Sequence, residues 1–160
     1  MATDEQKKAR ELRLYNDILA GFAKGLYDLF EDAALAIMKE IGAKVLAQME
    51  DELALEIQGE SPQDILDEIA RLLVDEYGLM TEINITFDDE SHHLGIHCQD
   101  CSFWQLCSSL KSDNIEPYVC VPMMMSTSSL HQRLGQRAKF GGITLTESNR
   151  TCAIDFQMID

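Results

Sequence analysis

Cysteine is the residue type with the clearest chemical potential in this sequence of 160 residues, and all five cysteines lie in its second half. Four of them follow the pattern C-x2-C-x5-C-x12-C, and the fifth stands at position 152. Thiolates are soft ligands that suit zinc or the iron of an iron–sulfur cluster, and four of them can close a tetrahedral site. We therefore predict one zinc ion or 4Fe–4S cluster, with the last cysteine as a substitute ligand. The candidate metal ligands are Cys98, Cys101, Cys107, Cys120 and Cys152.

Two other interpretations of the cysteines stay open. Unligated thiols are often buried as small apolar side chains, and the spacing matches neither the bacterial ferredoxin run nor the two-knuckle zinc pattern. A C-x-x-C pair such as Cys98 and Cys101 can also cycle between dithiol and disulfide. An odd number of cysteines without an export signal argues against a disulfide framework and predicts a reducing, cytoplasmic setting.

Other signatures of catalysis are missing from the sequence. It contains no G-x-G-x-x-G, Walker A, H-E-x-x-H or G-x-S-x-G motif, and no nucleophile–base pair can be nominated. We expect the four histidines to be structural rather than ligating: His92, His93, His97 and His131. The sequence thus favours a binding protein over an enzyme and leaves the second possibility open.

The cysteines follow a helical front half. Apolar residues from Leu12 to Phe30 recur at steps of three and four, which predicts a long amphipathic helix. A second helix is expected from Asp32 to Ile57, interrupted near Gly42. Ser61-Pro62 predicts the start of a third helix, because serine caps well and proline suits the first turn. Gly78 fits the left-handed position at its end.

After residue 78 the hydrophobic period changes from helix to strand. Apolar and polar residues alternate over 83–87 and 94–98, which predicts one hairpin. The same alternation over 143–145 and 152–158 predicts a second hairpin.

Between the hairpins, residues 99–116 are expected to form a loop or short helix, and residues 117–134 a helix that Gly135 ends. We therefore predict an α+β domain over residues 1–160, with N-terminal helices packed on an antiparallel sheet of two hairpins and an intervening helix. Its helical part would cover residues 1–78, and its sheet and cysteine-rich part residues 79–160.

The charge and hydropathy of the chain limit its partners. The net charge is −15, and the first 90 residues hold 22 acidic against 8 basic side chains. Such a surface repels phosphate, so we predict no direct contact with nucleic acid. The longest apolar run, Ala33 to Met38, is far short of the roughly 20 residues that span a bilayer, so no membrane partner is expected.

Four stretches of the sequence have counterparts in a known family. They are the helix start Arg13-Leu-Tyr-Asn-Asp-Ile-Leu, the second helix through Ile41-Gly42, the helix opened by Tyr118-Val-Cys120, and the terminal strand Asn149-Arg-Thr-Cys-Ala-Ile-Asp-Phe156. On these residues the whole chain resembles the 4-vinyl reductase domain, also described as archaeal hydrocarbon-binding proteins.

The resemblance implies a small-molecule-binding module that is often dimeric through its N-terminal helices and acts as a ligand sensor or carrier. Members of that family often hold zinc with cysteines at the helix start and in the final strand, which match Cys120 and Cys152. The family's acid-x-x-Cys before the last strand is missing here, where only Glu147 is acidic. Other cysteines of this chain would have to replace it, and clustered thiolates could hold an iron–sulfur cluster instead.

Residues and resemblance together predict a cytoplasmic protein that binds or senses a small apolar ligand beside a cysteine-ligated metal centre. The alternative is a redox enzyme or electron-transfer partner that uses an iron–sulfur cluster or the C-x-x-C. A homodimer is expected to bury the Leu12–Phe30 face or the side with Gly21 and Gly25. Methionines could line the ligand pocket or simply fill the core. The expected pocket residues are Phe22, Leu26, Ile69, Met124 and Phe156.

Overall fold

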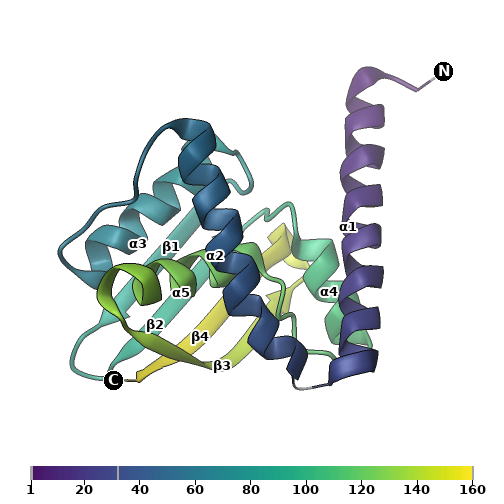
Figure 1. Ribbon diagram of the computed structural model, residues 1–160. Coiled ribbons are helices and arrows are strands. Elements are labelled where there is room, and N and C mark those ends of the chain that lie inside the picture. Colours follow the sequence, from purple (N-terminus) through teal and green to yellow (C-terminus); the bar gives the residue numbers. More distant parts are fainter. Residues whose placement is uncertain (1, 32, 160) are drawn as a thin grey trace.

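Helices come first along the chain and two strand hairpins follow, separated by two further helices (Figure 1). The computed structural model describes residues 2–31 and 33–159, without the side chains of residues 35, 36, 38 and 39. The expected helix start at Asp32 therefore lies outside the described residues. In chain order the elements are α1 (Asp4–Phe30), α2 (Ala33–Leu53), α3 (Pro62–Arg71), the π-helical turn η1 (Leu72–Glu76), β1 (Glu82–Asp88), β2 (His93–Gln99), α4 (Trp104–Ser112), α5 (Val121–Leu134), β3 (Arg137–Thr146), the 3-10 turn η2 (Ser148–Arg150) and β4 (Thr151–Ile159).

The two hairpins form one antiparallel sheet with the strand order β1-β2-β4-β3. Every second residue of the two central strands is buried, as alternation requires. In β2 these are Leu94, Ile96 and Cys98, and β4 contributes Cys152 and Ile154. Helices α2, α3 and α5 lie over this face of the sheet in Figure 1. The predicted α+β architecture, two antiparallel hairpins covered by helices, is confirmed.

Local signals at the helix ends also behave as predicted. Ser61 and Asp64 form a capping box, in which the Asp64 backbone N–H donates to Ser61 Oγ at 3.3 Å and the Ser61 N–H donates to Asp64 Oδ2 at 3.1 Å. Gly78 has φ +58° and Gly135 has φ +71°, the left-handed conformation that favours glycine after a helix.

The predicted interruption at Gly42 is wrong, because α2 is continuous through this residue. Gly42 instead lets the backbones of α2 and α5 approach closely. A Cβ atom at this position would lie 2.7 Å from the carbonyl oxygen of Met124 and would collide with the hydroxyl of Ser128. Gly42 is therefore explained by a close contact between two helices and not by a break in α2.

Two predicted boundaries move for local reasons. Helix α5 begins at Val121 and not at residue 117, and Pro122 sits undistorted in its first turn, where no backbone N–H is needed. Strand β3 begins at Arg137 rather than at residue 143. Its register shifts between Phe140 and Gly142, and this irregularity hides the alternation in the sequence.

Helix α1 stands to one side of the sheet and packs on α4 (Figure 1). It buries only a narrow line of side chains, Asn16, Ala20 and Ala23. The Asn16 amide donates to the carbonyl oxygen of Ser102 at 3.1 Å and accepts from the Leu106 N–H at 3.2 Å. Polar contacts therefore help to fix α1 on α4, beside the apolar cluster that Ala20 and Ala23 form with Leu106 and Leu110.

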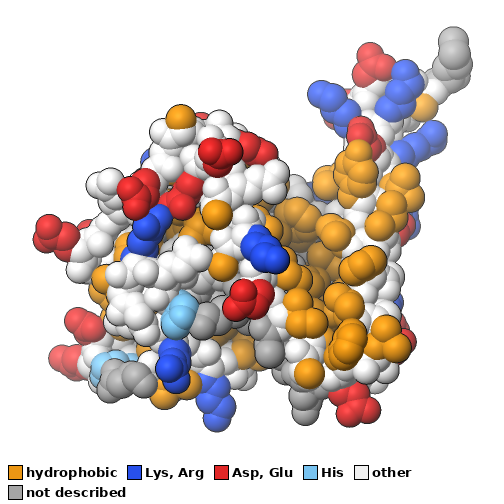
Figure 2. Space-filling model, in the orientation of Figure 1, with side chains coloured by type: hydrophobic (Ala, Val, Ile, Leu, Met, Phe, Trp, Pro, Cys, Tyr) orange, Lys and Arg blue, Asp and Glu red, His pale blue; other side chains and the backbone are white. Residues whose placement is uncertain are grey.

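The remaining apolar side of α1 is exposed. Nine large hydrophobic side chains are exposed in the described part of the chain, and eight of them lie on α1. Figure 2 shows hydrophobic side chains running along this helix and into the hollow beside it. A Cβ atom at Gly21 or Gly25 would meet nothing within 4 Å. We call this surface the α1 apolar face: Leu12, Leu14, Tyr15, Ile18, Leu19, Phe22, Leu29 and Phe30. None of the helices in the described ranges is long and apolar enough to cross a bilayer.

Candidate functional site

The five cysteines come from four elements that meet at the start of α5. Cys98 is the next-to-last residue of β2 and lies directly opposite Cys152 of β4 in the sheet register. Cys101 follows in the turn before α4, Cys107 lies within α4, and Cys120 is the residue immediately before α5. All five are buried and carry free thiols. We call them the thiol cluster.

Within the thiol cluster, two pairs of sulfurs are hydrogen-bonded. Cys98 pairs with Cys152 across the two strands, and Cys120 pairs with Cys107 between the start of α5 and α4. Cys101 is close enough to Cys120 and Cys152 to interact electrostatically with both. Folding thus brings the five predicted metal ligands into one region and arranges them as two pairs and a fifth member. Their role as metal ligands stays a prediction.

Burial and these contacts shift the thiol pKa values. The hydrogen bond to Cys152 and burial raise the pKa of Cys98, and the hydrogen bond to Cys107 and burial raise the pKa of Cys120. Burial raises the pKa of Cys101 to about 12. The hydrogen bond with Cys98 lowers the pKa of Cys152. Cys98, Cys101 and Cys120 are therefore protonated at neutral pH.

The donor set suits a thiophilic metal, but its arrangement is that of hydrogen-bonded pairs. Among residues 2–31 and 33–159, no group of three or more His, Cys, Asp or Glu side chains is arranged to hold a metal ion. The cluster does offer buried sulfur donors, the chemistry that zinc and iron prefer. Metal uptake would require the pairs to separate, the thiols to lose their protons and the sulfurs to converge.

The two histidines of β2, His93 and His97, lie on the face opposite Cys98, as the strand alternation predicts. His97 is exposed while its neighbour Cys98 is buried, because successive side chains point to opposite faces of β2. His93 lies on the same outer face, where its Nε2 is 3.2 Å from Oδ1 of Asp155.

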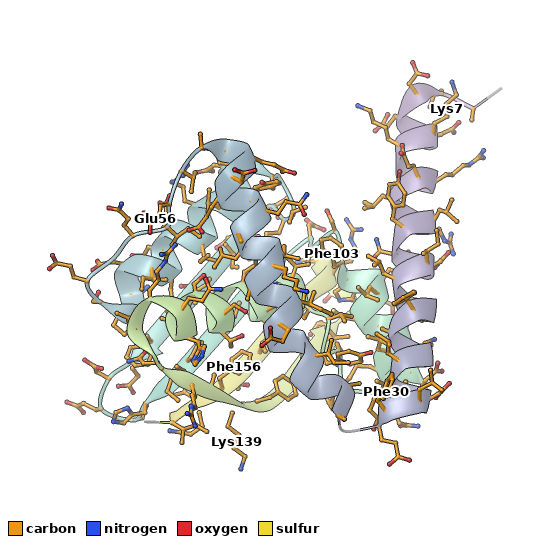
Figure 3. All side chains as sticks on the ribbon, in the orientation of Figure 1. Lys7, Phe30, Glu56, Phe103, Lys139 and Phe156 are labelled. Atoms are coloured by element: carbon orange, nitrogen blue, oxygen red, sulfur yellow. The ribbon has the colours of Figure 1, made fainter. Side chains whose placement is uncertain are left out.

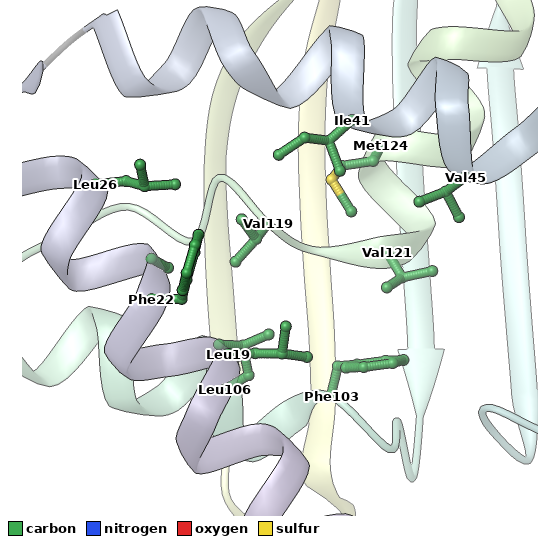
Figure 4. Close-up of a pocket in the computed structure, with 11 residues that line it drawn as sticks. Leu19, Phe22, Leu26, Ile41, Val45, Phe103, Leu106, Val119, Val121 and Met124 are labelled. Carbon is green, nitrogen blue, oxygen red and sulfur yellow. The ribbon is translucent and has the colours of Figure 1, made fainter.

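A cavity of about 250 Å³ lies beside the thiol cluster, between α1, α2 and the start of α5. Figure 4 shows side chains from all these elements pointing into it. Every lining residue is apolar. We call it the α1 pocket, and it is lined by Leu19, Phe22, Ala23, Leu26, Ile41, Val45, Phe103, Leu106, Val119, Val121 and Met124.

The structure separates the five residues that the sequence proposed for a ligand pocket. Phe22, Leu26 and Met124 line the α1 pocket together. Ile69 is fully buried in the main core under α3, and Phe156 borders a different cavity beneath α5. In Figure 3, Phe156 lies on the other side of α2 from Phe103.

Several walls of the α1 pocket were missed because they flank the cysteines. Val119 and Val121 stand on either side of Cys120, and Leu106 directly precedes Cys107. The signal was present as apolar residues adjacent to Cys107 and Cys120. As a result, the pocket and the thiol cluster share two segments of backbone.

Two solved structures are similar to this fold. One is a trafficking protein particle complex subunit 3 from Naegleria fowleri covalently bound to palmitic acid, with 12% identity over 92% of this chain and 97% of that chain, at a TM-score of 0.55. The other is the phenol-responsive sensory domain of the transcription activator PoxR with phenol, with 13% identity over 89% of this chain and 73% of that chain, at a TM-score of 0.53. At these identities the similarity shows the fold alone.

Sequence comparison identifies a family different from the one suggested by the motifs. No curated protein matches the chain. The matching family model is not the 4-vinyl reductase domain that the motifs resemble. The model that matches covers residues 15–159, nearly the whole sequence. The chain therefore belongs to the family described as "Putative rubredoxin C-terminal domain" (RdxA_C).

Proposed function

We propose that this protein binds a small apolar molecule in the α1 pocket and works as a sensor or carrier domain rather than as an enzyme. The observation that carries the proposal is the pocket itself, whose eleven lining residues are all apolar. A dry apolar cavity of roughly 150 Å³ accepts benzene, so about 250 Å³ suits one or two rings or a short chain. One structural neighbour is covalently bound to palmitic acid, and the other is a phenol-responsive domain with phenol.

The second part of the proposal is a homodimer formed through the α1 apolar face. Contiguous exposed apolar surface of this kind marks an interface in most proteins. Phe22 is 70% exposed and also lines the α1 pocket, so a second copy seated on α1 would cover the open side of the pocket. Dimer formation and ligand binding would then support each other.

The third part is a metal centre at the thiol cluster, either zinc or a 4Fe–4S cluster. The family description refers to rubredoxin, which points to iron or to redox chemistry, and the cluster supplies sulfur donors only. A bound metal would cross-link β2, β4, α4 and α5, and iron would add one-electron transfer. Electron transfer is thus the second candidate function. A reducing cytoplasm would keep the thiols available.

The ligand site is tested with N-phenyl-1-naphthylamine, an apolar dye whose fluorescence increases on binding. Val119→Trp fills the α1 pocket, whereas Val74→Trp adds the same bulk at another half-buried valine that does not line it. We expect the first variant to weaken dye binding at least tenfold and the second to bind like wild type. Equal binding by all three proteins, or none by wild type, would exclude the α1 pocket as the site.

The metal centre is tested by quantifying iron, zinc and acid-labile sulfide after purification without oxygen. We expect each Cys→Ser substitution at Cys98, Cys101, Cys107 and Cys120 to lower the metal content, and Cys152→Ser to do so if that thiol replaces one of the four. Ser108→Ala, next to Cys107 in α4, is the control and should keep it. A metal-free wild type would show that the thiols serve as buried apolar side chains.

A further inference from the structure

The two outer strands of the sheet, β1 and β3, differ in how their free edges are covered. Gln63 of α3 covers the edge of β1: its side-chain amide donates to the Ile85 carbonyl oxygen at 3.0 Å, and its Oε1 accepts from the Phe87 N–H at 3.1 Å. One side chain thus makes the contacts that a further strand would make. Uncovered edges invite other chains to pair with them, so this cover protects β1.

No side chain of the described residues covers the second half of β3 in this way. Apart from the β3–β4 ladder, no hydrogen bond within the described ranges reaches the backbone of residues 143–146. The first half of the strand is protected by other means, the charges of Arg137 and Lys139 and the irregular register between Phe140 and Gly142. Residues 143–146, Ile-Thr-Leu-Thr, have neither device and are rich in β-branched side chains, which favour strands.

A groove of about 640 Å³ runs along this uncovered edge, between β3 and α4. Figure 1 shows α4 on the β3 side of the sheet. The strand wall includes the consecutive residues Ile143, Thr144 and Leu145, whose side chains alternate between the two faces of the sheet. All three can line one groove only at the edge of the strand, where its free N–H and C=O groups point. The helix wall is one stripe of α4: Trp104, Ser108, Lys111 and Ser112.

The charges around the groove favour a positively charged partner. Lys111 is neutralised by Glu116, whose Oε1 lies 3.1 Å from the lysine Nζ. Glu147, at the end of the strand wall, is exposed and makes no ion pair with any described residue. The other lining residues are uncharged, and the whole chain has a net charge of −15. The local and the overall charge therefore both attract a basic segment.

We propose that β3 and α4 bind an extended, basic peptide segment of a partner protein, which extends the four-stranded sheet beside residues 143–146. Its backbone would pair with the free edge of β3, as in other complexes formed by strand addition. Every second side chain would be apolar and lie on the helix-covered face, next to Trp104 and Leu145, and a Lys or Arg would lie by Glu147. The proposal depends on neither the α1 pocket nor the thiol cluster.

The probe is an acetylated and amidated peptide, Lys-Thr-Val-Thr-Val-Thr-Arg, and the readout is hydrogen exchange of the amides of residues 143–146, followed by NMR. In the free protein the amides that face β4 should be protected, and the alternate ones, which face the groove, should exchange fast. We expect the peptide to protect this second set, in wild type and equally in Val119→Trp, which fills only the α1 pocket. Fast exchange that persists at saturating peptide would overturn the proposal, and protection that grows with protein concentration alone would assign the edge to a second copy instead.

Two further changes test the backbone and the charge separately. Methylating the backbone nitrogens of the valines removes donors from one edge of the peptide, and methylating those of the threonines removes donors from the other. One methylated peptide should bind about tenfold more weakly, and the other should bind like the parent. An equal effect of both would overturn strand addition.

Glu147→Lys should weaken peptide binding about fivefold at low salt, because it reverses the charge that faces the basic residue. Glu90→Lys makes the same change in the exposed turn between β1 and β2, away from the groove, and should bind like wild type. Equal affinities of the two variants would overturn the assignment of a basic partner.

Discussion

Helices α1 and α5 line the same pocket but differ in what surrounds them. Helix α1 has 27 residues, and its buried side chains are Asn16, Ala20 and Ala23, while its large apolar side chains are exposed. Helix α5 has 14 residues and buries eight of them, including three serines: Pro122, Met123, Met124, Met125, Ser126, Ser128, Ser129 and Leu130. Helix α1 thus carries large apolar side chains and leaves them exposed, whereas the shorter helix α5 buries more than half of its residues.

This difference shows that a hydrophobic pattern specifies a face to be covered and not the molecule that covers it. Most of residues 121–130 of helix α5 are buried because α2, α3 and the sheet pack against them, and the small serines fit that space. Helix α1 contacts its own chain only along one narrow line and offers the rest outward. We therefore regard α5 as scaffold and α1 as the helix with an apolar surface left uncovered, on which we propose that a second copy docks.

The largest expected effect is a pH dependence of the free energy of unfolding, which comes from the buried thiols around the start of α5. The pKa values of Cys98, Cys101 and Cys120 are raised on folding, so the native state holds more thiol protons than the unfolded state above pH 9. Stability should fall as the pH rises from about 9 to 12, with Cys101 alone contributing about 3–4 kcal/mol to the loss. The lowered pKa of Cys152 offsets part of it.

Urea unfolding of the reduced, metal-free protein between pH 8 and 11 measures this dependence. Cys101→Ala removes the contribution of this thiol, so the free energy of unfolding should fall less steeply with pH than in wild type. An identical slope in the variant and wild type would show that Cys101 is not among the thiols that carry the effect.

The next effect concerns the α1 apolar face. Ile18 is exposed on this face and does not line the pocket, so Ile18→Glu places a charge in the proposed dimer interface without filling the pocket. We expect the dimer dissociation constant to rise roughly 100-fold, a cost near 2.7 kcal/mol. Sedimentation at micromolar concentration would show the change. Arg13→Glu, outside this face on the same helix, should leave the dimer intact, and a monomeric wild type would refute the interface altogether.

Smaller effects on stability are expected from Gly→Ala substitutions at two helix positions, one packed against another helix and one open. Gly42→Ala should destabilise the protein by about 1–3 kcal/mol, because its Cβ would press on Met124 of α5. Gly21→Ala on α1 meets nothing and should stabilise the protein by about 0.5–1 kcal/mol through helix propensity. Thermal and urea unfolding measure both. If the two alanines had the same sign of effect, the contrast between a packed and an open helix would be lost.

Signals that act within a few residues were readable from the sequence. The Ser61 cap, the glycines after α3 and α5, and the alternation in β2 and β4 depend on nearest neighbours only, and all of them are present. Gly42 was misread because its role depends on α5, about eighty residues away. The start of β3 was missed for a different reason, since the bulge at Gly141–Gly142 breaks the period on which strand prediction relies.

For the candidate functional site, too, some features could be predicted from the sequence and others could not. The gathering of the five cysteines could be predicted, because strand ends and helix starts converge in a two-hairpin sheet. The pairing within the thiol cluster could not, since it follows from the register that sets Cys98 opposite Cys152. Among the expected pocket residues, Ile69 and Phe156 face the main core, and only the docking position of α1 determines which apolar residues are left to line a cavity.

The line of contact that holds α1 in place also sets how the α1 pocket can be entered. Alanines, the Asn16 amide and the hydroxyl of Tyr118, which donates to the Ala23 carbonyl oxygen at 2.7 Å, make up much of this attachment. Separating α1 from α4 would uncover Leu106, Leu110 and Tyr118 of the small apolar cluster between them, whereas the main core on the sheet would stay covered. Helix α1 is therefore expected to open as a unit more often than the sheet unfolds. Opening of this kind gives a ligand a route to an apolar cavity through brief detachment of one helix, with the core closed throughout.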